Sequence, residues 1–390
     1  MKSPGNSAMN FDFDTPIDRR DSDSMKWSRY AGKDVIPLWV ADMDFAAPPA
    51  VLAAIHKRID HGVFGYAKPW PSLTKAVQDH LQREYAWKVE APWIVWIPGV
   101  VAAFNVACRT VGGTGAGVFT TTPVYPPFLT APENSGRHLV TLPLVETDGR
   151  WGWDFAAVDK TLAESRARLW LLCHPHNPVG RAWDEAELRE IARLAEKHDV
   201  VVCSDEIHCG LVLDPARKHL PLASLSPEIA RRTITLMAPS KTFNIPALYS
   251  AFAVIPDPAL RRAFTRVMEG VMPHINTLGL VATESAYRDC EDWHKALIDY
   301  LRGNARRVEE AVAAMPYLRT TPVEATYLAW IDCRALCEAK GIANAQKFFE
   351  AAGVGLSDGK DFGLPGFVRL NFGCPRATLD EALKRMAAAL

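Results

Sequence analysis

The sequence lacks the apolar runs that membrane insertion and secretion require. No uncharged stretch reaches the roughly 20 apolar residues of a membrane-spanning helix. Residues Met1 to Ser24 are polar and contain no apolar core of a secretory signal. We therefore expect neither a membrane span nor a signal peptide, and no membrane partner.

A strong charge imbalance is also absent. The chain contains 44 basic and 45 acidic residues, for a net charge of -1. Proteins that bind nucleic acid or anionic surfaces usually carry a basic excess. The composition therefore gives no reason to expect nucleic acid as a partner.

Closely spaced cysteine pairs are missing as well. None of the eight cysteines forms a Cys-x-x-Cys pair, and Cys173 and Cys203 follow apolar residues. In a chain of 390 residues this pattern favours buried, reduced thiols over a disulfide framework. We expect a cytoplasmic location.

A dinucleotide fingerprint is absent, although the stretch 112–117 is rich in glycine. It does not match G-x-G-x-x-G, and it precedes a predicted strand, whereas a dinucleotide site follows one. This weakens an oxidoreductase interpretation. Internal repeats and low-complexity tracts are also missing.

What the chain does contain is a regular alternation of short apolar strands and helices. A 390-residue chain with 48% hydrophobic residues predicts a globular enzyme of two domains. Near-continuous apolar runs typical of strands buried on both faces occur at 116–120, 169–173, 200–203, 233–236 and 251–255. Asp184 and Glu187 form a capping-box pattern before a helix. The fold class expected is α/β: a three-layer αβα sandwich with a mixed, mostly parallel sheet.

The pattern changes after residue 285. A long helix is predicted over 285–314, strands over 326–331 and 367–371, and a last helix from Thr378 with Glu381 as capping partner. These elements indicate a smaller α+β domain. We expect a large domain at 46–285 and a small domain formed by 1–45 and 286–390.

Three residues in chain order describe a seat for pyridoxal phosphate (PLP). Asn177 lies in an Asn-Pro-x-Gly turn, Asp205 ends a strand, and Lys241 lies on a loop after the strand at 233–236. A lysine can bond the cofactor's aldehyde, an aspartate can pair with the pyridine nitrogen, and an asparagine can bond the ring oxygen. Each residue alone is more often an ordinary surface or turn residue, but their combination favours the cofactor site.

Other residues suit the same site, with simpler interpretations still open. Tyr125 could stack on a flat ring or simply pack in its loop. Gly99 could open a helix whose first amides, at Val100 and Val101, hold a phosphate. Arg369 lies mid-strand between apolar neighbours, where it could bind a substrate carboxylate or form an internal salt bridge.

A metal site is the weaker alternative for the segment Asp205–His208. His174 and His176 lie near another strand end and could supply further ligands. A metal needs three or four ligands at supporting spacing, which the sequence does not show. We expect no metal.

The chain resembles fold-type I PLP-dependent enzymes of the aminotransferase superfamily, and most closely their cystathionine β-lyase (MalY/PatB-like) branch of C–S lyases. The resemblance runs almost end to end. Its motifs are Trp39–Phe45, His61–Tyr66, Pro98–Val101, Ser204–His208, Ser240–Asn244, Ala325–Leu328 and Phe367–Asn371.

The resemblance implies roles for individual residues. Lys241 would be the catalytic, cofactor-bonded lysine and Asp205 the pyridine partner. The phosphate would be held by the Val100 and Val101 amides and Ser240. The remaining implied contacts are Asn177 and His208 on the ring oxygen, Tyr125 on the ring face, Tyr66 on the phosphate of a neighbouring subunit, and Arg369 with the Ala41 backbone on the substrate carboxylate. Tyr66 in that role implies a homodimer with an active site shared across the interface.

One departure bears on the reaction. Many aminotransferases carry an arginine eight residues after the lysine, and here that position is Tyr249. The resemblance therefore favours a lyase that cleaves cystathionine or related S-substituted cysteines to a thiol, pyruvate and ammonia. Two alternatives stay open: an aminotransferase acting on a small amino acid, and a regulatory binding protein that retains the PLP fold.

Overall fold

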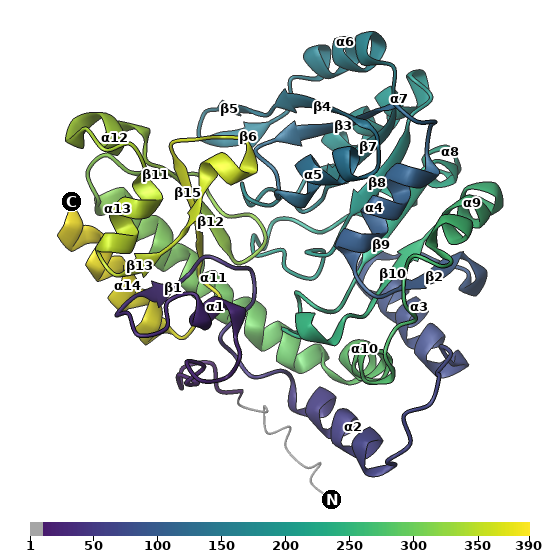
Figure 1. Ribbon diagram of the computed structural model, residues 1–390, viewed down its shortest axis with the longest axis horizontal. Coiled ribbons are helices and arrows are strands. Elements are labelled where there is room, and N and C mark those ends of the chain that lie inside the picture. The colour runs from purple at the N-terminus through teal and green to yellow at the C-terminus, as the bar shows by residue number, and fades with distance from the viewer. Residues whose placement is uncertain (1–10) are drawn as a thin grey trace, which may run out of the picture.

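The structure is a computed structural model that describes residues 11–390. Its centre is a seven-stranded sheet in the order β2-β10-β9-β8-β7-β3-β4 (Figure 1). The strands are β2 (Ile94–Ile97), β3 (Gly117–Thr122), β4 (His138–Pro143), β7 (Ala167–Cys173), β8 (Val201–Asp205), β9 (Thr233–Met237) and β10 (Ala251–Val254). Only β10 runs antiparallel to its neighbours in this sheet. The predicted α/β sandwich with a mostly parallel sheet is confirmed.

Both faces of the sheet are buried, as the continuous apolar strands predicted. Successive residues of β7 point to opposite sides: Leu169 and Leu171 join one core cluster, while Trp170 and Leu172 join another. The first cluster is covered by α4 (Val100–Thr110), α5 (Pro127–Asn134) and α9 (Pro258–Met268). The second is covered by α6 (Phe155–Ser165), α7 (Glu185–Lys197) and α8 (Pro227–Arg231).

Helix α7 begins as predicted. The Asp184 carboxylate accepts from the Glu187 backbone N–H at 3.0 Å, and the Glu187 side chain accepts from the Asp184 N–H at 2.8 Å. This capping box satisfies two amides that the first helical turn leaves without partners.

A second, four-stranded antiparallel sheet lies beside the first (Figure 1). Its order is β11 (Arg319–Thr320), β12 (Leu328–Asp332), β15 (Phe367–Asn371) and β14 (Ser357–Asp358). Helices α11 (Glu291–Ala314), α12 (Arg334–Lys340), α13 (Ala345–Ala351) and α14 (Arg376–Ala389) accompany it. The N-terminal part of the chain joins this region, because β1 (Ile36–Pro37) pairs in parallel with β13 (Val354–Gly355). The exact boundaries at 45/46 and 285/286 stay predictions, and residues 1–10 lie outside the described part.

The remaining elements lie at the edges. Two antiparallel strands, β5 (Val145–Thr147) and β6 (Arg150–Gly152), form a hairpin that faces the smaller sheet. Helices α2 (Pro49–Asp60), α3 (Pro71–Tyr85) and α10 (Thr277–Asp289) pack together, and α1 is the short helix Met25–Ser28. Short 3-10 turns occupy Ala91–Trp93, Leu222–Ser224, Pro246–Leu248 and Gly359–Phe362. Among residues 11–390 no helix is both long and apolar enough to cross a bilayer.

Several predicted element boundaries were wrong, and three of these differences have a local physical reason. The helix predicted over 285–314 is two helices, because Cys290 leaves helical geometry and separates α10 from α11. The last helix begins at Arg376 after Pro375, and not at Thr378, since proline suits the position just before a helix. Strand β12 begins at Leu328 and not at residue 326, because the Thr326 backbone has a positive φ and its N–H bonds to Leu211 O.

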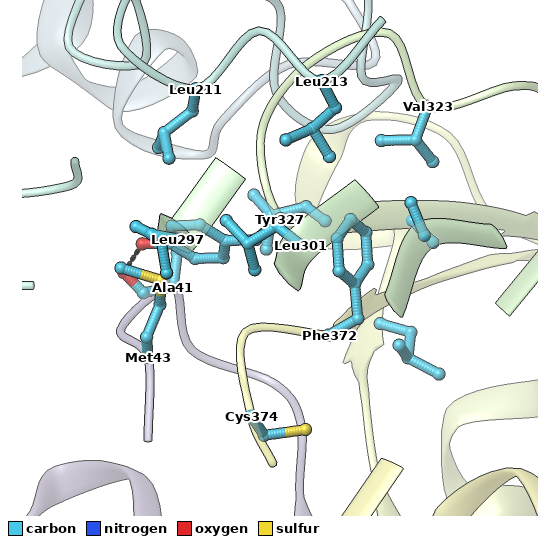
Figure 2. Close-up of a cluster of buried hydrophobic side chains, with 14 of the residues drawn as sticks. Ala41, Met43, Leu211, Leu213, Leu297, Leu301, Val323, Tyr327, Phe372 and Cys374 are labelled. Carbon is cyan, nitrogen blue, oxygen red and sulfur yellow. Dashed lines mark hydrogen bonds between the residues drawn. The ribbon is translucent and has the colours of Figure 1, made fainter. Parts of the chain in front are cut away.

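A cluster of buried apolar side chains lies between the N-terminal segment, the loop after β8 and helix α11 (Figure 2). Its labelled side chains come from the N-terminal segment (Ala41, Met43), the loop after β8 (Leu211, Leu213), α11 (Leu297, Leu301) and the segments before β12 and after β15 (Val323, Tyr327, Phe372, Cys374). Burial of these side chains holds the N-terminal segment against both parts of the molecule.

Candidate active site

The predicted site residues gather at one edge of the large sheet. Tyr125, Asn177 and Asp205 follow or end β3, β7 and β8, and Lys241 follows β9. These four strands are parallel neighbours, so their carboxyl ends share one edge. Strand β2 runs the same way, because β10 is antiparallel to both β2 and β9, and it delivers Gly99 to that edge. Ligands of open α/β sheets bind at this edge.

Lys241 is partly buried and points at the N-terminal segment. Its Nζ donates to the Ala41 carbonyl at 2.6 Å. Burial lowers the pKa of Lys241 to about 8, with Asp42 and Asp205 opposing the shift and Arg369 adding to it. The lowered pKa gives Lys241 a larger neutral fraction near neutral pH than an ordinary lysine has, which suits a lysine that bonds an aldehyde and transfers a proton.

Asp205 is buried without a compensating cation at ion-pair distance among residues 11–390. Its Oδ1 accepts from the Ile207 N–H at 3.1 Å. Burial raises the pKa of Asp205 to about 7, although the Ile207 amide and the charge on Lys241 lower it. A buried carboxylate in this state would be stabilised by a protonated ring nitrogen.

Asn177 and Arg369 are held together. Arg369 Nη1 donates to Asn177 Oδ1 at 2.9 Å, and Nη2 donates to Trp39 O at 2.7 Å. Arg369 is 4% exposed, and within the described chain it forms no ion pair; its Nε has no hydrogen-bond partner. Burial lowers the pKa of this guanidinium to about 10. The internal salt bridge considered for Arg369 is therefore not formed, and a buried cation remains for a carboxylate ligand.

His208 and Tyr125 border the same group. His208 is buried, its Nδ1 has no partner in the described chain, and burial with the charges of Lys241 and Arg369 lowers its pKa to about 3. The imidazole is therefore neutral. The Tyr125 N–H donates to Asn177 O at 3.1 Å, which ties this aromatic residue to the Asn177 turn.

Possible donors for an anion lie at the start of α4 and in the loop after β9. Gly99 is the N-cap, and Val100 and Val101 are the first helical residues, so their amides have no partner within the helix. Ser240 is almost buried and directly precedes Lys241. A helix N-terminus is suited to a phosphate, and the Ser240 hydroxyl lies after a strand that ends at the same edge of the sheet.

Tyr66 and Tyr249 are not brought into this cluster. Tyr66, in the loop between α2 and α3, is fully exposed, and Tyr249 is 66% exposed at a positive φ. Within one chain, Tyr66 forms no hydrogen bond with the other predicted site residues.

Sequence reasoning missed the groups that hold the N-terminal segment in place. Asn371 Nδ2 donates to Val40 O and Asp42 O at 2.6 and 2.7 Å. Asn244 Nδ2 donates to Met43 O and Phe45 O at 2.9 and 2.7 Å. Asn244 and Asn371 end two of the motifs named above. The sequence gives no indication of which backbone groups these side chains bond.

Tyr327 was also missed as a site residue. It is 1% exposed, and its hydroxyl donates to Ala41 O at 2.9 Å (Figure 2). The Ala41 carbonyl therefore accepts from both Tyr327 and Lys241.

The metal alternative finds no support in the geometry. No group of three His, Cys, Asp or Glu side chains in residues 11–390 is arranged to hold an ion. His174 Nε2 bonds Leu220 O, His176 Nε2 bonds Pro123 O, and Glu206 pairs with His219 at 2.7 Å.

The donor set fits PLP. Lys241, an amine of lowered pKa, suits the aldehyde, and Asp205, a buried carboxylate without an ion-pair partner in residues 11–390, suits the ring nitrogen. The Asn177 amide and the neutral His208 imidazole suit the ring oxygen, and the N-terminus of α4 suits the phosphate. Each polar group of the cofactor therefore has a candidate partner among these residues.

Comparison with known proteins supports a PLP site in this chain. The family model of aminotransferase class I and II matches residues 33–386. Cystathionine β-lyase PatB of Bacillus subtilis is 37% identical over 97% of this chain and 99% of its own. The crystal structure of OvoB has a TM-score of 0.94 at 43% identity, covering 97% of this chain and 99% of that one. Cystalysin from Treponema denticola, which contains a pyridoxal 5'-phosphate cofactor, has a TM-score of 0.92 at 34% identity over 98% and 99% of the two chains.

These matches are nearly full-length, and they include solved structures with PLP bound. The cofactor predicted from Lys241, Asp205 and Asn177 is therefore confirmed for the family. The chain belongs to the aminotransferase class I and II family of PLP-dependent proteins.

Proposed function

We propose that this protein is a PLP-dependent C–S β-lyase that cleaves cystathionine or a related S-substituted cysteine. The observation that carries the proposal is the buried Arg369 beside Asn177, which forms no ion pair with any residue of 11–390, in a chain whose relatives include proteins named cystathionine β-lyase. Tyr249 adds support, because it is exposed where many aminotransferases place a phosphate-binding arginine.

Bound PLP would supply an electron sink for the charge that develops at the substrate Cα. Arg369 would bind the α-carboxylate through its guanidinium. Lys241 would remove the Cα proton, for which its lowered pKa is suited. The Cβ–S bond then breaks, the sulfur leaves with the bonding electrons as a thiolate, and water completes the release of pyruvate and ammonia.

The test is a panel of S-substituted cysteines assayed for thiol and pyruvate together. Equal amounts of the two products from at least one thioether are expected. A flat pyruvate signal across the panel would refute the lyase. Formation of pyridoxamine phosphate without thiol would show transamination in its place.

Arg369 provides a prediction for substrate binding. Arg369→Ala should raise KM for the amino acid by about 100-fold, with a smaller change in kcat, because it removes a buried partner of the carboxylate. Arg369→Lys keeps the charge but loses the bidentate geometry, so its KM should lie between those of wild type and Arg369→Ala. Steady-state kinetics with one thioether measure both constants. An unchanged KM in the alanine variant would contradict the assignment.

We also propose a homodimer in which Tyr66 completes the neighbouring site. The loop between α2 and α3 exposes Val63, Phe64 and Tyr66 by 63%, 57% and 104%. Neighbouring exposed apolar side chains of this kind indicate a protein interface. An exposed tyrosine without a role in its own chain supports a contact with the cofactor phosphate of a second copy.

Mixing inactive variants tests the shared site. Lys241→Ala and Tyr66→Ala homodimers, unfolded and refolded together, should recover activity, because each mixed dimer then contains one site with both native residues. The same variants refolded separately are the control. If mixing restores nothing while sedimentation shows dimers, Tyr66 does not act across the interface.

We also propose a reducing, cytoplasmic location for the protein, on the evidence of its cysteines. All eight, none of which lies in residues 1–10, are free thiols, and six are buried. Such thiols persist in a reducing compartment.

A further inference from the structure

Glu324 lies at the centre of a cluster of arginines between the two sheets. Its side chain is 7% exposed. Oε1 accepts from Arg150 Nε at 3.0 Å, and Oε2 accepts from Arg181 Nε at 2.9 Å and from the Ala182 N–H at 3.1 Å. Arg217 Nε lies 3.2 Å from Oε1. We call this group, Glu324 with Arg150, Arg181 and Arg217, the Glu324 latch.

The Glu324 latch joins the smaller domain to the large one. Glu324 lies just before β12, whereas the arginines come from β6, from the turn after β7, and from the loop after β8. Two backbone bonds reinforce the contact: Ala325 N–H donates to Gly180 O at 2.9 Å, and Thr326 N–H donates to Leu211 O at 2.8 Å. Replacing the Glu324 carboxylate should be strongly destabilising, because its loss leaves the charges of its arginine partners uncompensated.

On one side, the latch fixes the turn that carries Asn177. The turn closes through the His176 N–H, which donates to Arg181 O at 2.7 Å. Gly180 has a φ of +71°, and a Cβ there would lie 3.2 Å from Val323 Cγ1, so the turn and the Glu324 segment fit closely. Arg181 thus connects Glu324 to the residue that bonds Arg369.

On the other side, the latch precedes a strained residue and Tyr327. Thr326 has a φ of +75°, which a β-branched residue rarely adopts and which surrounding contacts must impose. Next to it, the Tyr327 hydroxyl donates to Ala41 O, the atom that also accepts from Lys241 Nζ (Figure 2). Glu324 therefore lies three residues before Tyr327, whose hydroxyl shares its acceptor with Lys241.

We propose that Glu324 is a positioning residue for the cofactor site, which sets both the Asn177 turn and the Tyr327 hydroxyl. The contact between the two domains and the order of the groups around Lys241 then form together. The inference rests on the proposal that Lys241 binds PLP, but it does not depend on which substrate is cleaved.

The holoprotein with Glu324→Gln tests this role. We expect the dissociation constant for PLP to rise by about 10-fold or more, in the range found for outer partners of other ligand sites. The pH midpoint of the absorbance of the lysine-bound cofactor should shift as well. Tyr327→Phe should shift that midpoint in the same direction, and the double variant should add little, because both changes act through one connection.

Matched variants separate positioning from simple stabilisation. Glu324→Asp should partly restore PLP affinity, because it keeps the charge. Glu146→Gln removes another contact between the domains, the ion pair with Arg319 at 3.5 Å, which is not part of the latch, and should leave the absorbance midpoint unchanged. If Glu324→Gln does not fold, Arg181→Lys provides the same measurement with the charge retained.

Two results would overturn the inference. One is a Glu324→Gln protein that melts at a lower temperature yet keeps wild-type PLP affinity and absorbance midpoint. The other is full additivity of the Glu324 and Tyr327 shifts. A wild-type protein without a borohydride-reducible PLP on Lys241 would instead refute the proposed function, so the two failures are distinguishable.

Discussion

Replacing Lys241 with alanine is expected to lower kcat/KM by at least about 10³-fold, because one side chain supplies both the covalent bond and the proton transfer, and a positioned acid–base group alone contributes about 10²–10⁴-fold. Borohydride reduction of the wild-type protein, followed by peptide mass mapping, should place a pyridoxyl label on Lys241. The Lys241→Ala protein should carry no label at that peptide.

The control for this variant is Lys160→Ala. Lys160 lies on the outer helix α6 with its side chain 74% exposed and only a distant carboxylate, Glu164, at 3.9 Å. It should keep wild-type activity and labelling. A label on a different lysine in the wild-type protein, or full activity in Lys241→Ala, would remove the basis of the proposed chemistry.

Replacing Asp205 with asparagine is expected to have opposite effects on function and on stability. Activity should be lost, because an amide cannot hold the ring nitrogen protonated as a carboxylate does. The cofactor-free protein, however, should become more stable at pH 8, because wild type must then keep an ionised carboxylate buried without a cation.

The sign of the pH dependence follows from the raised pKa. Burial raises the pKa of Asp205 from 3.8 to about 7. The contribution of Asp205 to the free energy of unfolding is therefore fully present below about pH 4 and is lost as pH rises through 7. Asparagine does not titrate. The stability advantage of Asp205→Asn should therefore grow from pH 4 to pH 7 and then level off, at on the order of 4 kcal/mol.

Urea unfolding of both cofactor-free proteins across this pH range measures the difference directly. Buried histidines such as His174 and His208, whose pKa values burial lowers to about 3, also titrate in acid. They are common to both proteins, so their contribution largely cancels in the comparison. A stability difference that does not change with pH would show that Asp205 is not held as a buried, uncompensated acid.

The same carboxylate connects stability to cofactor binding. A group that is costly without its partner and favourable with it makes the site unstable when empty and stable when filled. PLP should therefore raise the melting temperature of wild type more at pH 8 than at pH 5, and this pH dependence should be lost in Asp205→Asn.

Much of the fold could be predicted from local patterns. The apolar runs at 169–173 and 233–236 predicted strands buried on both faces, because such runs are stable only between two layers. The Asp184–Glu187 pattern marked a helix start, since capping depends on residues three positions apart. Element ends were less predictable: the helical pattern continues through Cys290, where the structure separates α10 from α11, and α14 begins two residues before Thr378.

By itself, the sequence was enough to predict which residues carry the chemistry, because Lys241, Asp205 and Asn177 each have a side chain matched to one group of PLP and lie after predicted strands. Only the tertiary structure decided what surrounds them. Ala41 and the segment with Glu324 and Tyr327 lie far from these residues along the chain. Chain folding alone brings Ala41 O to Lys241, 200 residues away, and Glu324 to Arg181, 143 residues away. Hydrogen bonds between such distant groups leave no periodic or spaced pattern in the sequence, since their partners are chosen by the packing of whole domains.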